Sequence, residues 1–119
     1  MRARTLLVFT LLLLAVLAVG QTTEQGVARW KGVVQNGRLV LTAEIDKGWH
    51  VYSTVPVTDG PFPTEVKATG LKLGTPIDEK GIKKENDPNF GKEVGFWADK
   101  AEISVPVVSG TSGEAQITY

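Results

Sequence analysis

Short stretches of this chain alternate apolar and polar residues, and this period of two constrains the fold more than any other feature. Every second side chain of residues 38–45 is apolar, namely Leu39, Leu41, Ala43 and Ile45. Because successive side chains of a strand point to opposite faces of its sheet, this pattern predicts a strand with one buried face. Residues 101–108 and 114–119 alternate in the same way. Pro106 predicts an edge strand or a bulge, since proline cannot donate a ladder hydrogen bond.

Turn-forming residues separate the strand candidates. Asn36-Gly37 is the strongest turn signal, because both residues tolerate the positive φ that a two-residue hairpin needs. Further strand candidates lie at residues 27–34, 49–54, 64–68, 71–73 and 94–97. We expect the polar residues 74–91 to form a long exposed loop, with at most a short strand near Ile82. About seven short strands predict an all-β fold, an immunoglobulin-like antiparallel β-sandwich.

The start of the chain has the pattern of an export signal. Arg2 and Arg4 give a positive start, a long apolar run follows, and small residues precede Gln21. An uncleaved membrane anchor is the alternative, but the run is shorter than the ~20 residues that span a bilayer. We therefore expect a cleaved signal peptide over residues 1–20 and one extracytoplasmic domain over residues 21–119.

The composition excludes several classes of function. The chain has 13 basic and 13 acidic residues among 119, without the basic stripe that a nucleic-acid-binding protein needs. With no cysteine and a single histidine, it cannot build a zinc site of the Cys/His type. Without disulfides, which are common in exported domains of this size, the domain must be held together by packing alone. We expect no metal, no other cofactor and no small-molecule substrate.

Trp49, His50 and Tyr52 follow a turn and form the first candidate site. In a strand, His50 and Tyr52 would share one face and offer a polar, aromatic patch. The alternative is an ordinary surface histidine on a strand.

Asp87, Phe90 and Gly91 lie in a polar segment and form the second candidate site. An aromatic ring on a loop must either pack back against the domain or cover another surface. Both interpretations of Phe90 stay open at this point. The charged residues nearby are interpreted as a solvated face. They are Glu79, Lys80, Lys83, Lys84 and Glu85.

Four motifs follow one another in an order that is more specific than any of them alone. They are Gly48-Trp49-His50-Val51-Tyr52-Ser53, Gly60-Pro61-Phe62-Pro63-Thr64, Asp87-Pro88-Asn89-Phe90-Gly91-Lys92-Glu93-Val94, and a last strand ending in Thr118-Tyr119. Together they resemble the N-terminal periplasmic domain of the thiol:disulfide interchange protein DsbD, over residues 27–119. The resemblance implies a periplasmic immunoglobulin-like domain that takes reducing equivalents from a membrane electron-carrier domain. It would hand them to thioredoxin-like periplasmic proteins, such as disulfide isomerases and proteins of cytochrome c maturation.

The resemblance also implies roles for the two candidate sites. A loop with an aromatic residue caps the cysteine pair in the family. The matching segment here runs from Asp87 to Gly91, with Phe90 as the candidate cap. The match is imperfect, because Pro88 and Asn89 replace bulkier or acidic residues. The aromatic patch beside the cysteines would be formed by Trp49, His50 and Tyr52.

The cysteines of the family are missing here. In the family they follow a strand that ends in a pair such as Thr118-Tyr119, which is where this sequence stops. We expect a partial chain whose cysteines come just after Tyr119, and the 119 residues alone should lack thiol-reductase activity. The alternative is a natural cysteine-free relative, a binding module that docks a protein partner through His50, Tyr52 and Phe90.

Overall fold

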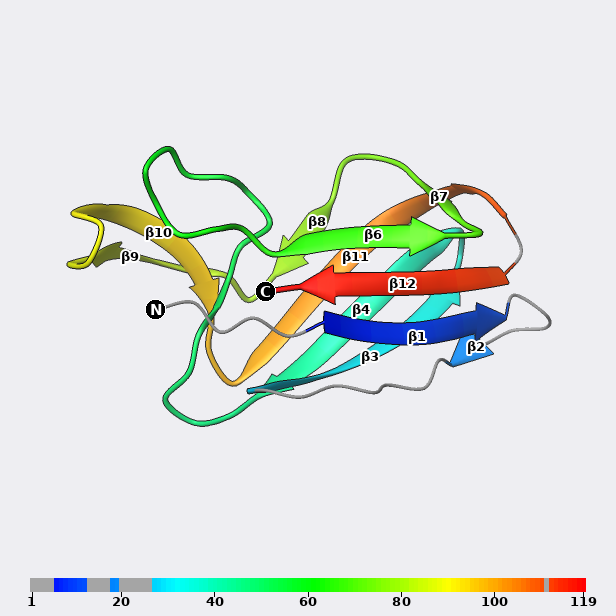
Figure 1. Cartoon of the computed structure of the whole chain (residues 1–119), viewed down its shortest axis with the longest axis horizontal. Helices are drawn as coiled ribbons and strands as arrows, with labels where there is room; N and C mark the ends of the chain where they lie inside the picture. The colour runs from blue at the N-terminus through cyan, green and yellow to red at the C-terminus, as the bar shows by residue number, and fades with distance from the viewer. Residues whose placement is uncertain (1–5, 13–17, 20–26, 111) are drawn as a thin grey trace.

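The computed structural model describes residues 6–12, 18–19, 27–110 and 112–119 (Figure 1). All regular secondary structure in these ranges is β-strand. The strands are β1 (Leu6–Leu12), β2 (Ala18–Val19), β3 (Ala28–Gln35), β4 (Arg38–Ile45), β5 (Val51–Tyr52), β6 (Glu65–Thr69), β7 (Lys72–Leu73), β8 (Asp78–Lys80), β9 (Lys83–Asp87), β10 (Lys92–Trp97), β11 (Lys100–Ser109) and β12 (Ser112–Thr118). The all-β prediction is confirmed.

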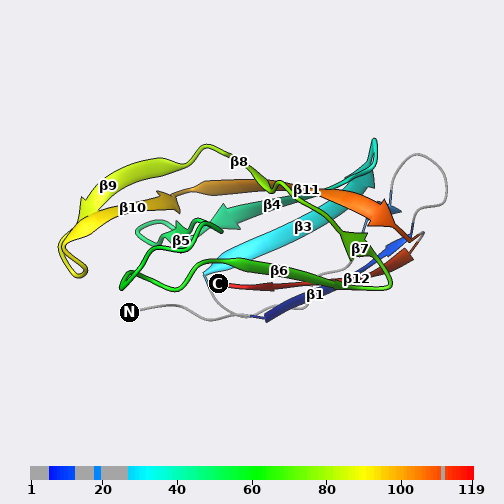
Figure 2. The same ribbon diagram turned by 90° about the horizontal axis from the view of Figure 1, so that it is seen from above.

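The strands form an antiparallel sandwich. One sheet has the order β2-β3-β4-β11-β7, and β8 also pairs with β11. A second sheet, β1-β12-β6, lies across one face of the first, as Figure 2 shows. A third sheet, β5-β10-β9, extends the molecule at one end. This architecture agrees with the expected immunoglobulin-like sandwich.

Both β1 and β2 lie within the predicted export signal. The rest of residues 1–20 lies outside the described ranges, so cleavage of the signal stays a prediction.

The hairpin predicted at Asn36-Gly37 is confirmed. Both residues have positive φ, 53° and 73°, and the flanking residues Gln35 and Arg38 face each other across β3 and β4. This geometry matches the right-handed twist of the two strands, which is why the turn sets their register.

The core lies between the two main sheets and follows the alternation in the sequence. On β4, Leu39 and Leu41 are fully buried, and Ile103 on β11 faces Leu41 across the ladder. The opposite sheet contributes Ala115 and Ile117 from β12, both fully buried. Burying one large aliphatic side chain contributes roughly 1.5–3 kcal/mol.

The strand that contains Pro106 carries a register shift just after it, which agrees with the bulge, one of the two predicted contexts. The edge alternative is wrong, because β11 pairs with β4 on one side and with β8 and β7 on the other. The ladder with β7 shifts register between Val107 and Ser109. The carbonyl of Pro106 accepts a 2.8 Å hydrogen bond from the Gly74 amide, so the strand stays tied to its neighbour beside the proline.

Two expectations about strand lengths are corrected. Residues 74–91 are not one long loop, since they contain β8 and β9. Both strands are polar. They form because β8 pairs with β11 and β9 pairs with β10, not because they bury an apolar face. The strand expected at residues 49–54 is only β5, because the polar groups of Ser53 and Thr54 bond to a neighbouring segment described below.

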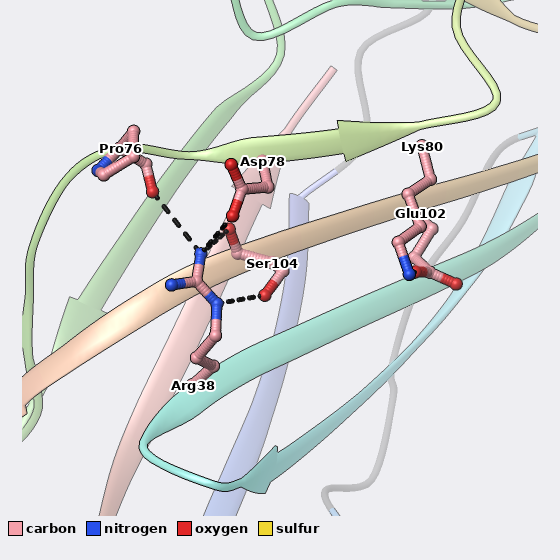
Figure 3. A network of polar contacts seen from close by, with 6 residues as sticks. All are labelled: Arg38, Pro76, Asp78, Lys80, Glu102 and Ser104. Carbon is pink, nitrogen blue, oxygen red and sulfur yellow. Dashed lines mark hydrogen bonds and ion pairs between the residues drawn. The ribbon is translucent and has the colours of Figure 1, made fainter.

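A polar network on the outer face of the first sheet fixes β8 against β11 (Figure 3). The guanidinium of Arg38 donates to the Asp78 carboxylate and to the Ser104 carbonyl, both at 2.9 Å. Two residues farther along β8, the Lys80 ammonium lies 3.3 Å from the Glu102 carboxylate. Asp78 and Lys80 therefore point outward, so the residue between them, Glu79, points toward the other face.

Two valines of β11 test whether packing alone holds the sandwich. Val105 is 1% exposed and Val108 is 61% exposed. Val105→Ala should lower the free energy of unfolding by about 2 kcal/mol, because it removes buried methyl groups and leaves a cavity. The matched Val108→Ala should change it by less than about 0.5 kcal/mol. Equal effects in urea unfolding would contradict this placement of the core.

Candidate functional site

The loop expected as a cap, residues 87–91, is the turn of the β9-β10 hairpin at one end of the molecule (Figure 1). Asp87 organises this turn. Its Oδ1 accepts the Asn89 amide at 2.8 Å, and its carbonyl accepts the amides of Phe90 at 3.1 Å and Gly91 at 2.7 Å. Gly91 has a φ of 66°, a conformation that costs glycine little. The turn is thus fixed by local hydrogen bonds, and Phe90 keeps 36% of its surface exposed.

Tyr52 links the first candidate site to this turn. Strand β5 pairs with β10, with Tyr52 facing Phe96, and the Tyr52 hydroxyl makes a long hydrogen bond of 3.5 Å to Oδ2 of Asp87. Burial of the phenol, followed by the negative charge of Asp87 and this hydrogen bond, raises the pKa of Tyr52 above its usual value. The phenol therefore stays neutral and able to donate to the carboxylate.

His50 and Trp49 are placed differently from Tyr52. The His50 imidazole is exposed and stacks on the buried Phe96 ring, with centroids 4.1 Å apart and planes at 21°. Trp49 lies in the turn before β5, where its amide donates to the Asp46 carbonyl, and it is 47% exposed. Of the three residues, Tyr52 contacts the cap loop directly and His50 covers a residue of the same hairpin.

Glu79 was expected to be part of a solvated charged face, and the structure corrects this. Its carboxylate accepts hydrogen bonds from the Ser53 hydroxyl at 2.7 Å, the Thr54 amide at 2.7 Å and the Thr54 hydroxyl at 2.8 Å. The Glu79 carboxylate thus accepts three hydrogen bonds and anchors the chain directly after β5. No sequence pattern predicted this role, because Glu79 belongs to a short strand of charged residues.

The segment between β5 and β6 is closed at its base and carries apolar residues outward. The Thr64 hydroxyl donates to the Tyr52 carbonyl at 2.6 Å, and the Thr64 amide donates to the Ser53 carbonyl at 3.1 Å. Val55 is 62% exposed and Phe62 is 68% exposed. A firmly held loop with exposed apolar side chains suits contact with another surface, because little conformational entropy is lost on binding.

The last strand ends beside these elements. In both views β12 runs toward the end of the molecule from which the β9-β10 hairpin extends (Figures 1 and 2). Tyr119, 5% exposed, donates its hydroxyl to the Ala28 carbonyl at 3.1 Å and stacks at an angle on Trp30. The alternation predicted for residues 114–119 is thus confirmed up to the last residue.

Within the described residues, the polar contacts of the site form neither a nucleophile–base pair nor a metal cluster. The Ser53 hydroxyl donates to Glu79 rather than to the imidazole of His50. Within the ranges given above, no three His, Asp or Glu side chains gather closely enough to hold a metal ion.

Comparison with known families decides what kind of domain this is. The family described as "Thiol:disulfide interchange protein DsbD, N-terminal" matches residues 20–119. The chain belongs to this family. The match includes the cap loop, Tyr52 and the last strand, so the resemblance found in the sequence is confirmed. No curated protein and no solved structure matches the chain. None of the described residues forms a helix long and apolar enough to cross a membrane.

The three hydrogen bonds to Glu79 predict a stabilising role. Glu79→Ala should lower the free energy of unfolding by about 2 kcal/mol, because three partly buried donors lose a charged acceptor. It should also speed hydrogen exchange of the Thr54 amide. Glu85→Ala, at an exposed position of β9, is the matched control and should change neither quantity. Unchanged exchange at Thr54 in Glu79→Ala would contradict the anchor.

The bond between Tyr52 and Asp87 predicts a pH effect. Because the folded state favours the neutral phenol, the free energy of unfolding should fall as the pH rises from the usual tyrosine pKa through the raised one. Asp87→Asn should lower the pKa of Tyr52, measured by absorbance of the phenolate. Asp99→Asn is the control, and Tyr52→Phe assigns the signal. A Tyr52 pKa that Asp87→Asn leaves unchanged would rule out the interaction.

Proposed function

We propose that this domain works in the periplasm as a thiol–disulfide interchange domain. It takes reducing equivalents from a membrane electron-carrier domain and passes them to thioredoxin-like proteins, such as disulfide isomerases and proteins of cytochrome c maturation. The observation that carries this proposal is the family match over residues 20–119. The expected export signal at residues 1–20 supports the location.

The chemistry requires two cysteines, which we place on a segment after Tyr119 in the complete protein. A thiolate of this pair attacks the disulfide of the acceptor and forms a mixed disulfide. The second thiol then attacks the mixed disulfide. The domain ends with its own disulfide, and the two electrons and two protons leave with the acceptor as its two thiols. The direction of β12 toward the β9-β10 hairpin supports this placement, because the chain leaves the sheet on the side of the cap loop.

The cap loop has a protective role in this proposal. Phe90 shields the reduced pair from oxidants, while Tyr52 and Asp87 hold the turn in place. The exposed side chains of Phe62 and Trp49 contribute apolar surface to partner docking.

Phe90 and Phe62 offer a matched test of the cap. In a protein that includes the cysteines, Phe90→Ala should raise the alkylation rate of the reduced cysteines severalfold. The reason is that the alkylating reagent reaches the thiolate more easily once the ring is removed. Phe62→Ala, which removes the same ring from a different loop, should leave the rate unchanged. If both variants react like the parent protein, Phe90 only packs.

The second candidate function is a cysteine-free binding module that docks a protein through His50, Tyr52 and Phe90. The complete lack of cysteine in the 119 residues favours it. The two functions separate on a non-reducing gel. The complete protein, incubated with a thioredoxin-fold partner in which the resolving cysteine is Ala, should form a mixed disulfide. Residues 1–119 are the control and should form none, and a complete protein that also forms none would favour the binding module.

A further inference from the structure

Two residues at the base of the cap loop reach into the segment between β5 and β6. Asp87 ends β9 and Lys92 begins β10, and the two residues face each other across the ladder. Asp87 accepts a hydrogen bond from the Tyr52 hydroxyl at 3.5 Å, and the Lys92 ammonium donates to the Thr58 carbonyl at 2.5 Å. The cap loop is therefore held at both of its ends by one segment that lies far away in the sequence.

The residues that Lys92 contacts form a fixed support, which we call the Thr58 loop (residues 55–63). In both views the segment between β5 and β6 lies beside the β9-β10 hairpin (Figures 1 and 2). At the tip of the loop the Gly60 amide donates to the Val57 carbonyl at 3.0 Å, and a Cβ at Gly60 would lie 2.8 Å from Cγ1 of Val57. Thr58 lies inside this tight turn, so its carbonyl is held in place for the ammonium.

We propose that Lys92 is a positioning residue that couples the cap loop to the Thr58 loop. The inference rests on the proposed shielding role of the cap loop and adds the residue that controls it. A hydrogen bond from an ammonium is stronger than one between neutral groups. Lys92 is also partly buried, whereas Lys84 on β9 is exposed. Loss of the contact lets the cap loop open more often, and movement of the Thr58 loop changes the cap loop as well.

Hydrogen exchange in the 119-residue chain tests the coupling without any cysteine. The amides of Phe90 and Gly91 report opening of the cap loop, since both donate to the Asp87 carbonyl. Lys92→Met, which removes the ammonium but keeps an apolar stem, should speed their exchange about fivefold. Lys92→Arg can still donate and should keep the parent rates. Lys84→Met is the matched control and should leave the rates unchanged.

A change in the Thr58 loop tests the coupling from the other side. Gly60→Ala forces the tip of the loop apart and should speed exchange of the Phe90 and Gly91 amides. In the Lys92→Met background the same substitution should have little further effect on these amides, because the contact that transmits it is gone. Leu41 is fully buried in the core, and its amide should exchange at the parent rate in every variant, which shows that the domain stays folded.

Alkylation links the coupling to shielding. In a protein that includes the cysteines, Lys92→Met should raise the alkylation rate of the reduced cysteines severalfold. Combined with Phe90→Ala it should add nothing, because Lys92 acts through the position of the Phe90 ring. Lys84→Met should leave the rate at the parent value.

Four results would overturn the role of Lys92. The first two are unchanged exchange of the cap-loop amides in Lys92→Met and a Lys92→Arg variant that exchanges as fast as Lys92→Met. The third is a Gly60→Ala effect on these amides that is absent, or equally large with and without Lys92. The fourth is an alkylation effect of Lys92→Met that is equally large with and without Phe90→Ala. Failure of the proposed function looks different, because exchange then follows the expectations above while neither Lys92→Met nor Phe90→Ala changes the alkylation rate.

Discussion

The antiparallel pairing of β4 with β11 is the constraint on which the rest of the molecule depends. The two strands face each other from Lys100 opposite Glu44 to Pro106 opposite Arg38. Their inward side chains, including Leu41 and Ile103, are fully buried. These 119 residues contain no cysteine, so no disulfide among them can substitute for this packing. The pair both aligns the first sheet and supports the second.

The pairing of β4 with β11 also sets the geometry of the candidate functional site. Arg38, the first residue of β4, donates a hydrogen bond to Asp78. This contact helps to set the register of β8 along β11. That register turns Glu79 toward the chain after β5, where it bonds to Ser53 and Thr54.

The position of β5 determines which side chain reaches the turn of the β9-β10 hairpin. Strand β5 pairs with β10, so Tyr52 lies within reach of Asp87 at the hairpin turn. The turn at residues 87–91 is therefore tied to β5 by the hydrogen bond between Tyr52 and Asp87. A single long hydrogen bond of this kind can open at modest cost.

The sequence predicted the parts of the fold that have an apolar face. Residues 38–45 and 114–119 became strands with the expected buried side chains, and Asn36-Gly37 became the expected hairpin. The strands β8 and β9 were missed, because residues such as Lys83 and Glu85 give no alternation, and their strand form depends on pairing with distant segments.

The candidate site was predicted only in outline. The family resemblance pointed to Tyr52 and to the turn at residues 87–91, and the family match supports that resemblance. The role of Glu79 could not be predicted, because its three donors come from residues far away in the sequence. The stacking of His50 on Phe96 likewise depends on how β5 and β10 pair.

We propose that the thiol chemistry of this family is carried by a segment after Tyr119. The most direct measurement is the nucleotide sequence that follows the Tyr119 codon in the gene. The predicted result is an open reading frame with two cysteine codons soon after Tyr119. A stop codon immediately after Tyr119 would contradict the claim and leave a domain with the family's fold but without its thiols.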